Sequence, residues 1–437
     1  MRTNNALVNQ LMHNIAWTHR GNMLSTGTDC PQRDERLGWA ADFFEFSQTA
    51  SFGREMAPFM MKWLQDMRDE QLPDGRYPDW APDSNPAQDD RFGAPGWGDG
   101  AALMPWVVYR FYGDTRALER ALDSVIKWHN YCKSQSPGFI WSQGRHMDYG
   151  EWLNGDTQIL DGYPRGVSEM PKEQFATAFM AYTAKIAAQM ARVVGREDDA
   201  AALQADYEAT RAAYRARYLK DGALTKETQA GYALTLNFGL ADESERAFMT
   251  SRLLALIEQY SAHISTGIHA THRMMLELTK GGQHAEANRL LNLRTVPSWG
   301  YMIDQGATTI WERWDGYVAG RGFQNPSMNS FNHWAIGSVG EWIWRTIVGI
   351  NPDDAAPGFK HVIIRPLPDP ATSLVSATYD SIRGPITIKY DWDTETGAFD
   401  MTLTLPPGVT ATVDVPGGAQ GLTCGVGTHT FNTVYKQ

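Results

Sequence analysis

Acidic, basic and aromatic side chains crowd one short segment near the start of the chain. Residues 28–42 read TDCPQRDERLGWAAD and hold four carboxylates, two arginines and a tryptophan. Carboxylates are rarely buried without partners, because removing their charge from water is unfavourable. The apolar, aromatic segment that follows, FFEFSQTASF, places Asp42 at the start of a buried helix. We therefore expect a polar pocket here, and the charged side chains of the segment are Asp29, Arg33, Asp34, Glu35, Arg36 and Asp42.

A second acidic and aromatic segment follows much later in the chain. In GATTIWERWDG, residues 306–316, Glu312 lies between Trp311 and Arg313, 277 residues after Glu35. Two carboxylates flanked by tryptophans are typical of glycoside hydrolases, in which one carboxyl protonates the departing oxygen and the other activates water or attacks the anomeric carbon. Trp311 is then a candidate for contacting the sugar. The competing interpretation is that each glutamate is a structural carboxylate paired with an arginine.

Tryptophans also accompany carboxylates in two long expected loops, at 73–100 and 137–171. GWGDG contains Trp97 and Asp99, and DYGEWLNGD contains Trp152. An indole ring can stack on a sugar face while a neighbouring carboxylate binds sugar hydroxyls, and packing in the core is the equally weighted alternative. His333, in NSFNHWAIG, follows the second acidic segment and is a candidate ligand for the same sugar, or else a core histidine.

Charge and hydropathy exclude several classes of partner. The net charge is −11 and Lys and Arg form no cluster, which argues against nucleic acid and against anionic membranes. No apolar run approaches the roughly 18 residues of a membrane span, and the first residues show no signal-peptide pattern. The chain as given is therefore expected in the cytoplasm, or in the periplasm or outside the cell if its N-terminus is incomplete.

The sequence indicates neither a metal nor a cofactor. Cys30, Cys132 and Cys424 are too widely spaced for a zinc site or a disulfide framework, so free thiols are expected. The GxxxxGKS, GxSxG and HExxH patterns are absent. Cys30 has no histidine base near it in the sequence and is expected to pack rather than to act as a nucleophile.

Hydrophobic periodicity divides the chain into a helical part and a strand-rich part. Up to about residue 350, apolar residues recur at three and four positions and predict eleven or twelve helices, including continuous ones over 42–71 and 270–293. Beyond residue 351, alternating β-branched residues with Pro and Gly turns predict a small antiparallel sandwich. We expect two domains, 1–352 and 353–437, with the paired helices of the first closing into a ring.

Three segments together resemble a known family. TDCPQRDERLGWAAD, GATTIWERWDG and SFNHWAIGSVGEWIW, in this order, are similar to the catalytic domain of glycoside hydrolase family 78, the bacterial and fungal α-L-rhamnosidases. The resemblance implies a mainly α fold, an (α/α)6 barrel of about twelve helices followed by a small antiparallel β-sandwich domain. It also implies inverting hydrolysis of terminal α-L-rhamnosyl residues from a rhamnose-containing small molecule or oligosaccharide, without cofactor or metal.

The resemblance further implies roles for individual residues. The general acid of the family falls on Glu35 and its general base on Glu312. An inverting pair needs its carboxyl groups about 6.5–9.5 Å apart, so that a water molecule fits beside the sugar. The positions that correspond to substrate contacts are Asp29, Arg33, Trp39, Asp42, Trp97, Trp152 and His333.

Two departures from the family pattern carry expectations of their own. The β-sandwich domains that generally precede the barrel are missing from the chain as given, which would leave apolar barrel surface open to self-association into a homo-oligomer. Glu151 stands where the family more often has Asp, so a change of specificity is expected in that loop. Two alternatives to a rhamnosidase stay open: an exo-glycosidase of the same fold acting on another sugar, and a non-catalytic carbohydrate-binding protein.

Overall fold

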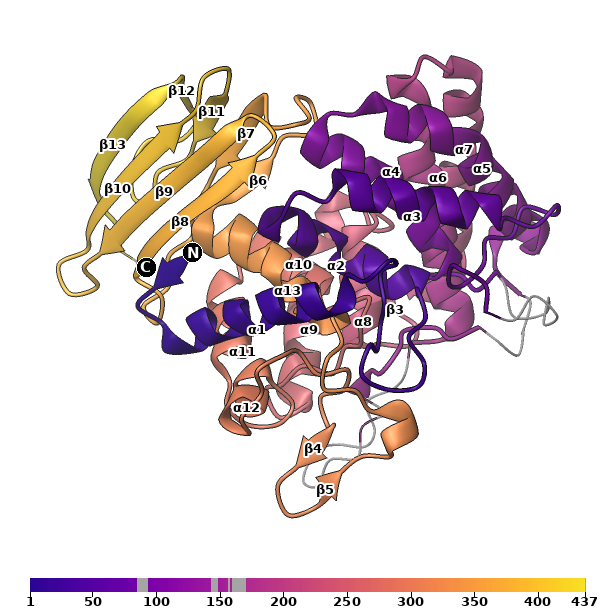
Figure 1. Ribbon diagram of the computed structural model, residues 1–437, viewed down its shortest axis with the longest axis horizontal. Helices are drawn as coiled ribbons and strands as arrows, with labels where there is room; N and C mark the ends of the chain where they lie inside the picture. Colours follow the sequence, from indigo (N-terminus) through magenta and orange to yellow (C-terminus); the bar gives the residue numbers. More distant parts are fainter. Residues whose placement is uncertain (85–92, 143–147, 156–157, 159–169, 437) are drawn as a thin grey trace.

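Six helical hairpins form a ring beside a β-sandwich in the computed structural model, which describes residues 1–84, 93–142, 148–155, 158 and 170–436 (Figure 1). Six helices form the inner ring: α2 (Ala40–Gly53), α4 (Gly98–Tyr112), α6 (Lys172–Val193), α8 (Gln229–Asn237), α10 (Thr271–Lys280) and α13 (Val339–Trp342). Six others lie outside them: α1 (Ala6–Asn22), α3 (Ala57–Asp69), α5 (Thr115–Ser134), α7 (Glu197–Tyr218), α9 (Arg246–Gln259) and α11 (His284–Asn292). The expected (α/α)6 barrel is confirmed.

Burial separates the two rings of helices. Twelve of the fourteen residues of α2 and eight of the nine of α8 are buried, against six of the 22 of α7. An inner helix packs on its outer partner and on its inner neighbours, so it needs apolar or small residues on every side, whereas an outer helix needs a single apolar stripe. A short helix, α12 (Trp299–Asp304), lies between α11 and α13, and a 3-10 turn, η6 (Ala335–Ser338), and a π-helical turn, η7 (Ile343–Val348), flank α13.

The continuous helices expected over 42–71 and 270–293 are wrong, because each is a hairpin of two helices. The first breaks between α2 and α3, where Arg54 is extended and Tyr112 accepts a hydrogen bond from the Met56 amide at 2.8 Å. The second breaks between α10 and α11 at Gly281 and Gly282, and Gly282 has φ 77°, which favours glycine. The apolar pattern continues across both breaks because both helices of each hairpin face the core.

Two sheets form the C-terminal sandwich. One has the order β1 (Arg2–Thr3), β8 (Leu374–Ser381), β9 (Gly384–Trp392), β10 (Ala398–Leu405) and β13 (Gly427–Val434), all antiparallel. The other has the order β12 (Leu422–Cys424), β11 (Thr410–Val413), β7 (His361–Ile364) and β6 (Ile350–Pro352). Its β11–β7 pair is parallel, so the sandwich is not antiparallel throughout. Two small hairpins, β2 (Leu219–Lys220) with β3 (Ala223–Leu224) and β4 (Tyr317–Val318) with β5 (Gly322–Phe323), project from the barrel.

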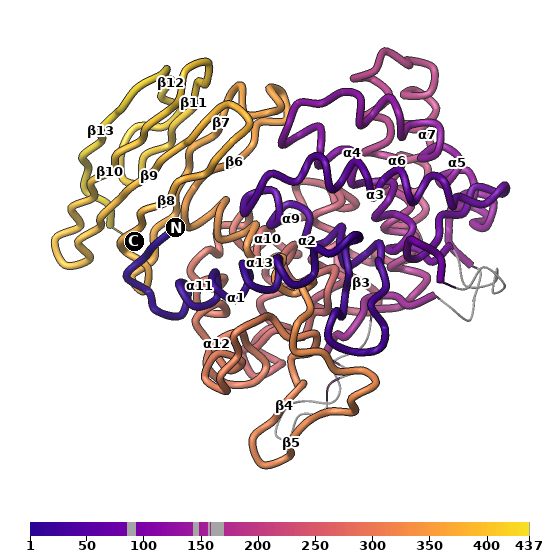
Figure 2. Tube along the Cα trace, in the orientation of Figure 1, coloured from indigo at the N-terminus to yellow at the C-terminus, as the bar shows by residue number. Residues whose placement is uncertain are grey.

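The sandwich takes strands from both sides of the barrel. The boundary expected at 352/353 falls at the end of β6, which already belongs to a sandwich sheet, and the N-terminal β1 pairs with β8. Figure 2 shows both chain ends beside the sheet that contains β1 and β8. Among the described residues, no helix is long and apolar enough to span a membrane.

A cluster of aromatic rings joins the barrel to the sandwich. Phe52, at the end of α2, stacks on Trp344 with ring centroids 5.5 Å apart and meets the edge of Tyr379 of β8 at 5.2 Å. Phe359 contacts Tyr379 at 4.7 Å and Phe111 of α4 at 5.8 Å. Because these rings are buried between the two parts, the barrel and the sandwich are expected to unfold together.

Phe52→Ala should lower the free energy of unfolding by about 3–5 kcal/mol, since it removes a buried ring that contacts both parts. Urea denaturation followed by circular dichroism measures this loss. Phe248→Ala, in which the lost ring is 45% exposed, is the matched control and should change stability by less than about 0.5 kcal/mol. Equal losses in the two variants would contradict the proposed junction.

Candidate active site

The loop between α1 and α2 presents the first acidic segment. Asn22, the last residue of α1, donates from Nδ2 to the Asp29 carbonyl at 2.7 Å. The Asp29 amide donates to the Leu37 carbonyl at 3.1 Å, and the Leu37 amide donates back to Asp29 Oδ1 at 3.2 Å. These bonds close a loop of which Arg33 and Glu35 form the tip, while Asp42 lies in the first turn of α2.

One guanidinium contacts both candidate catalytic carboxylates. Arg33 donates from Nε to Glu35 Oε2 at 2.9 Å and also contacts this oxygen through Nη2. It donates from Nη1 to Glu312 Oε2 at 2.8 Å. Glu35 Oε1 accepts a further bond from the Trp39 indole at 2.7 Å. Burial opposes the charge of Arg33, but the carboxylates outweigh it and raise the pKa of the guanidinium. The two carboxylates are thus bridged by one guanidinium.

The second acidic segment is positioned by its own turn. The Glu312 amide donates to the Ser330 carbonyl at 2.8 Å, and the His333 amide donates to the Ile310 carbonyl at 2.8 Å. Arg313, the sequence neighbour of Glu312, pairs instead with Asp315 at 2.8 Å. Glu312 therefore has the expected arginine partner, but that partner is Arg33, near the start of the barrel sequence.

Asp29, Asp42 and His333 form a second charged group beside the glutamates. His333 Nε2 lies 3.0 Å from Asp42 Oδ1. Burial disfavours the imidazolium, but the hydrogen bond and charge of Asp42, with Glu312 and Asp29, raise the pKa of His333 to about 9. Burial, followed by the charges of Glu35 and Asp42, raises the pKa of Asp29 well above its usual range. The like-charge repulsion within the cluster thus acts on the protonation of Asp29.

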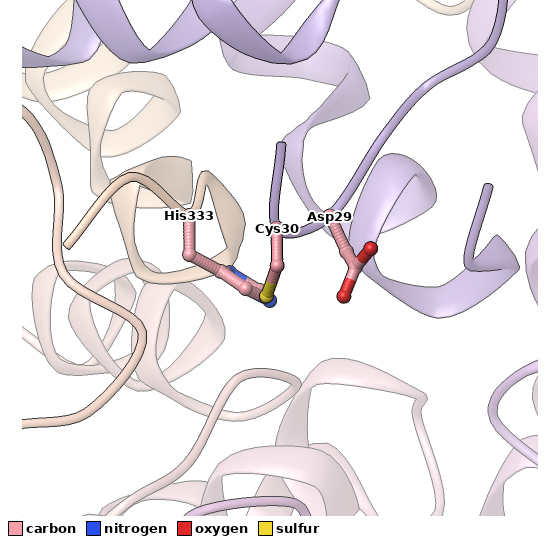
Figure 3. Close-up of side chains that lie close together, drawn as sticks. All are labelled: Asp29, Cys30 and His333. Carbon is pink, nitrogen blue, oxygen red and sulfur yellow. The ribbon is translucent and has the colours of Figure 1, made fainter. Parts of the chain in front are cut away.

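Asp29, Cys30 and His333 also bring three potential metal donors together. These atoms all lie within 4.8 Å of one another (Figure 3). A divalent cation needs deprotonated ligands. Burial raises the pKa of the Cys30 thiol and of the Asp29 carboxyl, and Asp42 outweighs burial and raises the pKa of His333. A cation would therefore have to displace protons from this trio in order to bind.

The two glutamates, Arg33, Asp29, Asp42 and His333 open onto one cavity of about 550 Å³ at the amino ends of the inner helices. Aromatic rings form much of its wall: Trp97 and Tyr149 have centroids 4.5 Å apart, and Trp39 meets Trp80 at 4.7 Å. Nine of the predicted site residues line this cavity: Asp29, Arg33, Glu35, Trp39, Asp42, Trp97, Trp152, Glu312 and His333. The arrangement offers two carboxylates for acid–base chemistry and aromatic faces for stacking.

Two predicted substrate contacts, Asp99 and Trp311, are not among the residues that line the cavity. Asp99 is 1% exposed and accepts hydrogen bonds from Trp128 at 2.9 Å, Thr183 at 2.6 Å and the Gly96 amide at 2.7 Å. Trp311 is buried and packs on Phe331 at 4.8 Å. Asp99 thus organises the start of α4, and Trp311 supports the segment that carries Glu312.

Five residues of the cavity wall are not among the predicted site residues: Leu37, Trp80, Ser84, Tyr149 and Met328. Tyr149 lies next to the predicted Trp152 and contacts Trp97, Trp39 and Trp152 in the wall. Its place in the segment DYGEWLNGD was the available signal. Nothing in the sequence distinguishes Leu37 or Met328 from core residues.

Glu151 does not line the cavity but supports the segment that carries Trp152. Its Oε1 accepts the Gly267 amide at 2.7 Å and the Ala270 amide at 3.1 Å, just before α10. The Trp152 carbonyl accepts the Ile268 amide at 3.0 Å, and a Cβ at Gly267 would lie 1.9 Å from that carbonyl oxygen. The shift of specificity expected at Glu151 has no direct contact to support it, because the carboxylate faces the α10 backbone.

Glu151→Ala should lower the free energy of unfolding by about 2–4 kcal/mol, because it leaves two buried amides without an acceptor. Glu151→Gln keeps an acceptor oxygen in place and should lose less than half of that amount. Urea denaturation of the two variants beside the parent chain compares them. Equal losses would mean that the carboxylate acts by its charge alone.

The pKa of His333 should fall from about 9 towards about 6.5 in Asp42→Asn, because the charge that favours the imidazolium is removed. The Ala335 amide donates to Nδ1 at 3.2 Å and favours the neutral ring, so the cation depends on Asp42. NMR titration of the imidazole measures the shift, and a parent value at or below about 6.5 would contradict it. A pKa raised by folding stabilises the fold fully below about pH 6.5 and ceases to do so as the pH rises through about 9.

Comparison with known proteins places the chain in a family. Residues 1–347 match the bacterial alpha-L-rhamnosidase 6 hairpin glycosidase domain, and residues 349–430 match the bacterial alpha-L-rhamnosidase C-terminal domain. An alpha-L-rhamnosidase of Streptomyces avermitilis is 42% identical over 416 residues, which cover 95% of this chain and 38% of that protein. One from Formosa agariphila is 34% identical over 412 residues, which cover 94% of this chain and 43% of that protein.

Solved structures agree with the sequence matches. The crystal structure of the Streptomyces avermitilis alpha-L-rhamnosidase complexed with L-rhamnose is similar with a TM-score of 0.90 at 39% identity, over 99% of this chain and 42% of that one. The alpha-L-rhamnosidase of Aspergillus terreus is similar with a TM-score of 0.91 at 29% identity, over 99% of this chain and 50% of that one. The present chain thus spans half or less of the length of each of these relatives. It belongs to the bacterial alpha-L-rhamnosidase family and consists of the six-hairpin glycosidase domain followed by the C-terminal domain of that family.

Proposed function

We propose that this protein is an inverting α-L-rhamnosidase that removes terminal rhamnose, with Glu35 as general acid and Glu312 as general base. One observation carries the proposal. Two glutamates from segments 277 residues apart face one aromatic-walled cavity and share a single arginine. A purely sugar-binding protein needs no such carboxylate pair, which disfavours the non-catalytic alternative.

The different exposure of the two glutamates supports their roles. The Glu35 side chain is 23% exposed, whereas the Glu312 side chain is 3% exposed. The acid must reach the oxygen that joins rhamnose to the rest of the substrate, so it belongs near the mouth of the cavity. The base needs only a water molecule and the far side of the sugar, so it belongs deeper.

Both carboxylates bind Nη2 of Arg33, which limits the gap between their nearest oxygens to about 6 Å, so the anomer released, and not this contact, separates inversion from retention. In the reaction, Glu312 accepts a proton from water as the oxygen of that water bonds to the anomeric carbon. The glycosidic bond breaks, and its oxygen takes the proton of Glu35.

Arg33, Asp29 and His333 supply further contacts for the sugar. The guanidinium of Arg33, which binds both glutamates, can also donate to a sugar hydroxyl. The Asp29 carboxyl and the His333 imidazole line the same cavity and can bind sugar hydroxyls. The cavity wall thus contains both hydrogen-bond donors and indole faces.

Glu35→Gln and Glu312→Gln should each lower kcat on nitrophenyl α-L-rhamnoside by about 10²–10⁴-fold with the fold intact, because each removes proton transfer in the transition state. Asp34→Asn is the matched control, since the Asp34 side chain is fully exposed next to Glu35, and it should keep the parent rate. NMR of the first-formed rhamnose should show the inverted anomer. Near-parent activity in either glutamine variant would remove that residue from the mechanism.

The same assay tests the alternatives that the sequence left open. Turnover of another nitrophenyl glycoside, with none of the rhamnoside, would favour an exo-glycosidase of different specificity. Binding of L-rhamnose by calorimetry without turnover of any glycoside would favour a carbohydrate-binding protein.

A further inference from the structure

A second and larger cavity, which we call the junction cavity, lies at the other end of the barrel. It measures about 690 Å³, and all six inner helices contribute residues to it, together with β6, β7 and the adjoining loops. It shares no lining residue with the catalytic cavity. Along α4, Trp97 lines the catalytic cavity and Arg110 the junction cavity, a separation of roughly 20 Å at the rise of an α-helix. Its size is within the range of small-molecule sites, about 300–1,000 Å³.

Two buried side chains in its wall have polar atoms that the described residues leave without a hydrogen bond. His272 is 3% exposed and Glu341 is 1% exposed, and both line the junction cavity. The unbonded atoms are His272 Nδ1 and Glu341 Oε2. His272 Nε2 lies 3.6 Å from Glu45 Oε2 and 3.9 Å from Glu341 Oε2, distances too long for hydrogen bonds. Both side chains thus keep unused hydrogen-bonding capacity beside the cavity.

The charged residues of the wall mostly compensate one another. Arg345 donates to Glu341 at 2.7 Å, and Glu277 accepts from Asn237 at 2.9 Å and pairs with Arg246. A charged ligand would have to compete with these pairs. The carboxyl ends of the inner helices carry partial negative charge, which also disfavours a small anion.

The neutral form of His272 also favours an uncharged ligand. Burial, followed by the charge of Arg273, lowers the pKa of His272 well below its usual range, so the ring is neutral and offers one donor and one acceptor. The other titratable groups that line the cavity are Arg110, Tyr182, Arg273, Glu277, Lys280, Glu341, Arg345, Asp354 and Arg365. Of the charged ones, Lys280, Asp354 and Arg365 are exposed at the rim.

Aromatic rings complete the wall. Phe44, Trp106 and Tyr182 line the cavity, and Trp106 and Tyr182 are half-buried. Tyr182 is held by stacking on Phe238 with ring centroids 4.2 Å apart. Flat apolar rings beside paired donors and acceptors suit a molecule with C–H faces and several hydroxyls.

We propose that the junction cavity binds a neutral, polyhydroxylated ligand of the size of a mono- or disaccharide, separately from the catalytic cavity. The ligand hydroxyls donate to Glu341 and accept from or donate to His272, and its apolar face lies against Trp106 or Tyr182. This site does not depend on the proposed hydrolysis, because it uses none of the catalytic residues.

Calorimetric titration of the full chain with D-glucose and sucrose tests the proposal, with inorganic phosphate and D-glucuronate as anionic probes. At least one neutral sugar should bind with a dissociation constant below about 10 mM. That binding should weaken about tenfold or more in Glu341→Gln and in Trp106→Ala, each of which removes one part of the wall. It should be unchanged in Trp152→Ala, a matched tryptophan removal in the catalytic cavity.

Three results would overturn the proposal. They are binding of no neutral sugar, loss of binding in Trp152→Ala in place of the junction variants, and binding of phosphate or glucuronate alone through the junction residues. Glu341→Gln preserves the shape of the side chain, so it provides a test even if Trp106→Ala fails to fold. Hydrolysis of nitrophenyl α-L-rhamnoside is measured separately, so failure of this site and failure of the proposed function give different results.

Discussion

Closure of the helical ring between its first and last hairpins is the constraint on which the candidate active site depends. Trp334, wholly buried, stacks on Phe43 and Phe46 of α2 with ring centroids 5.1 and 5.4 Å apart. The Ile310 amide donates to Thr18 of α1 at 2.7 Å. These contacts bring the loop after α1 against the turn before α13, and thereby set Glu312 beside Arg33. The stacking of apolar rings thus assembles the polar site.

Charge compensation then keeps that polar site, and the barrel behind it, in one arrangement. Arg33 holds two carboxylates at the catalytic cavity, and further along the barrel Arg273 pairs with the wholly buried Glu45 and lies over the ring of Phe238. A buried charge without a partner is strongly destabilising, so each of these pairs restricts which helices can be neighbours. The lumen is consequently polar at both ends, and each end has its own cavity.

Much of the fold was predictable because its signal is local. The apolar periodicity of the helices and the alternation of the strands depend only on near neighbours in the chain. The breaks between α2 and α3 and between α10 and α11 were not predictable, since both helices of a hairpin face the core and the apolar pattern does not pause. Asp99 and Glu151 show the corresponding limit at the site. Both are carboxylates beside tryptophans, as a sugar ligand would be, yet both accept hydrogen bonds from buried groups of the protein.

The sequence by itself determined the family, the mainly helical fold and the two acidic segments, because residue types and their order along the chain carry that information. Tertiary structure alone decided that Glu312 pairs with Arg33 and not with its neighbour Arg313, and that Tyr149 belongs to the cavity wall. It also decided that burial, with the charges of Glu35 and Asp42, raises the pKa of Asp29. Pairing and protonation depend on distances between segments and on burial, and neither quantity exists until the ring of helices has closed.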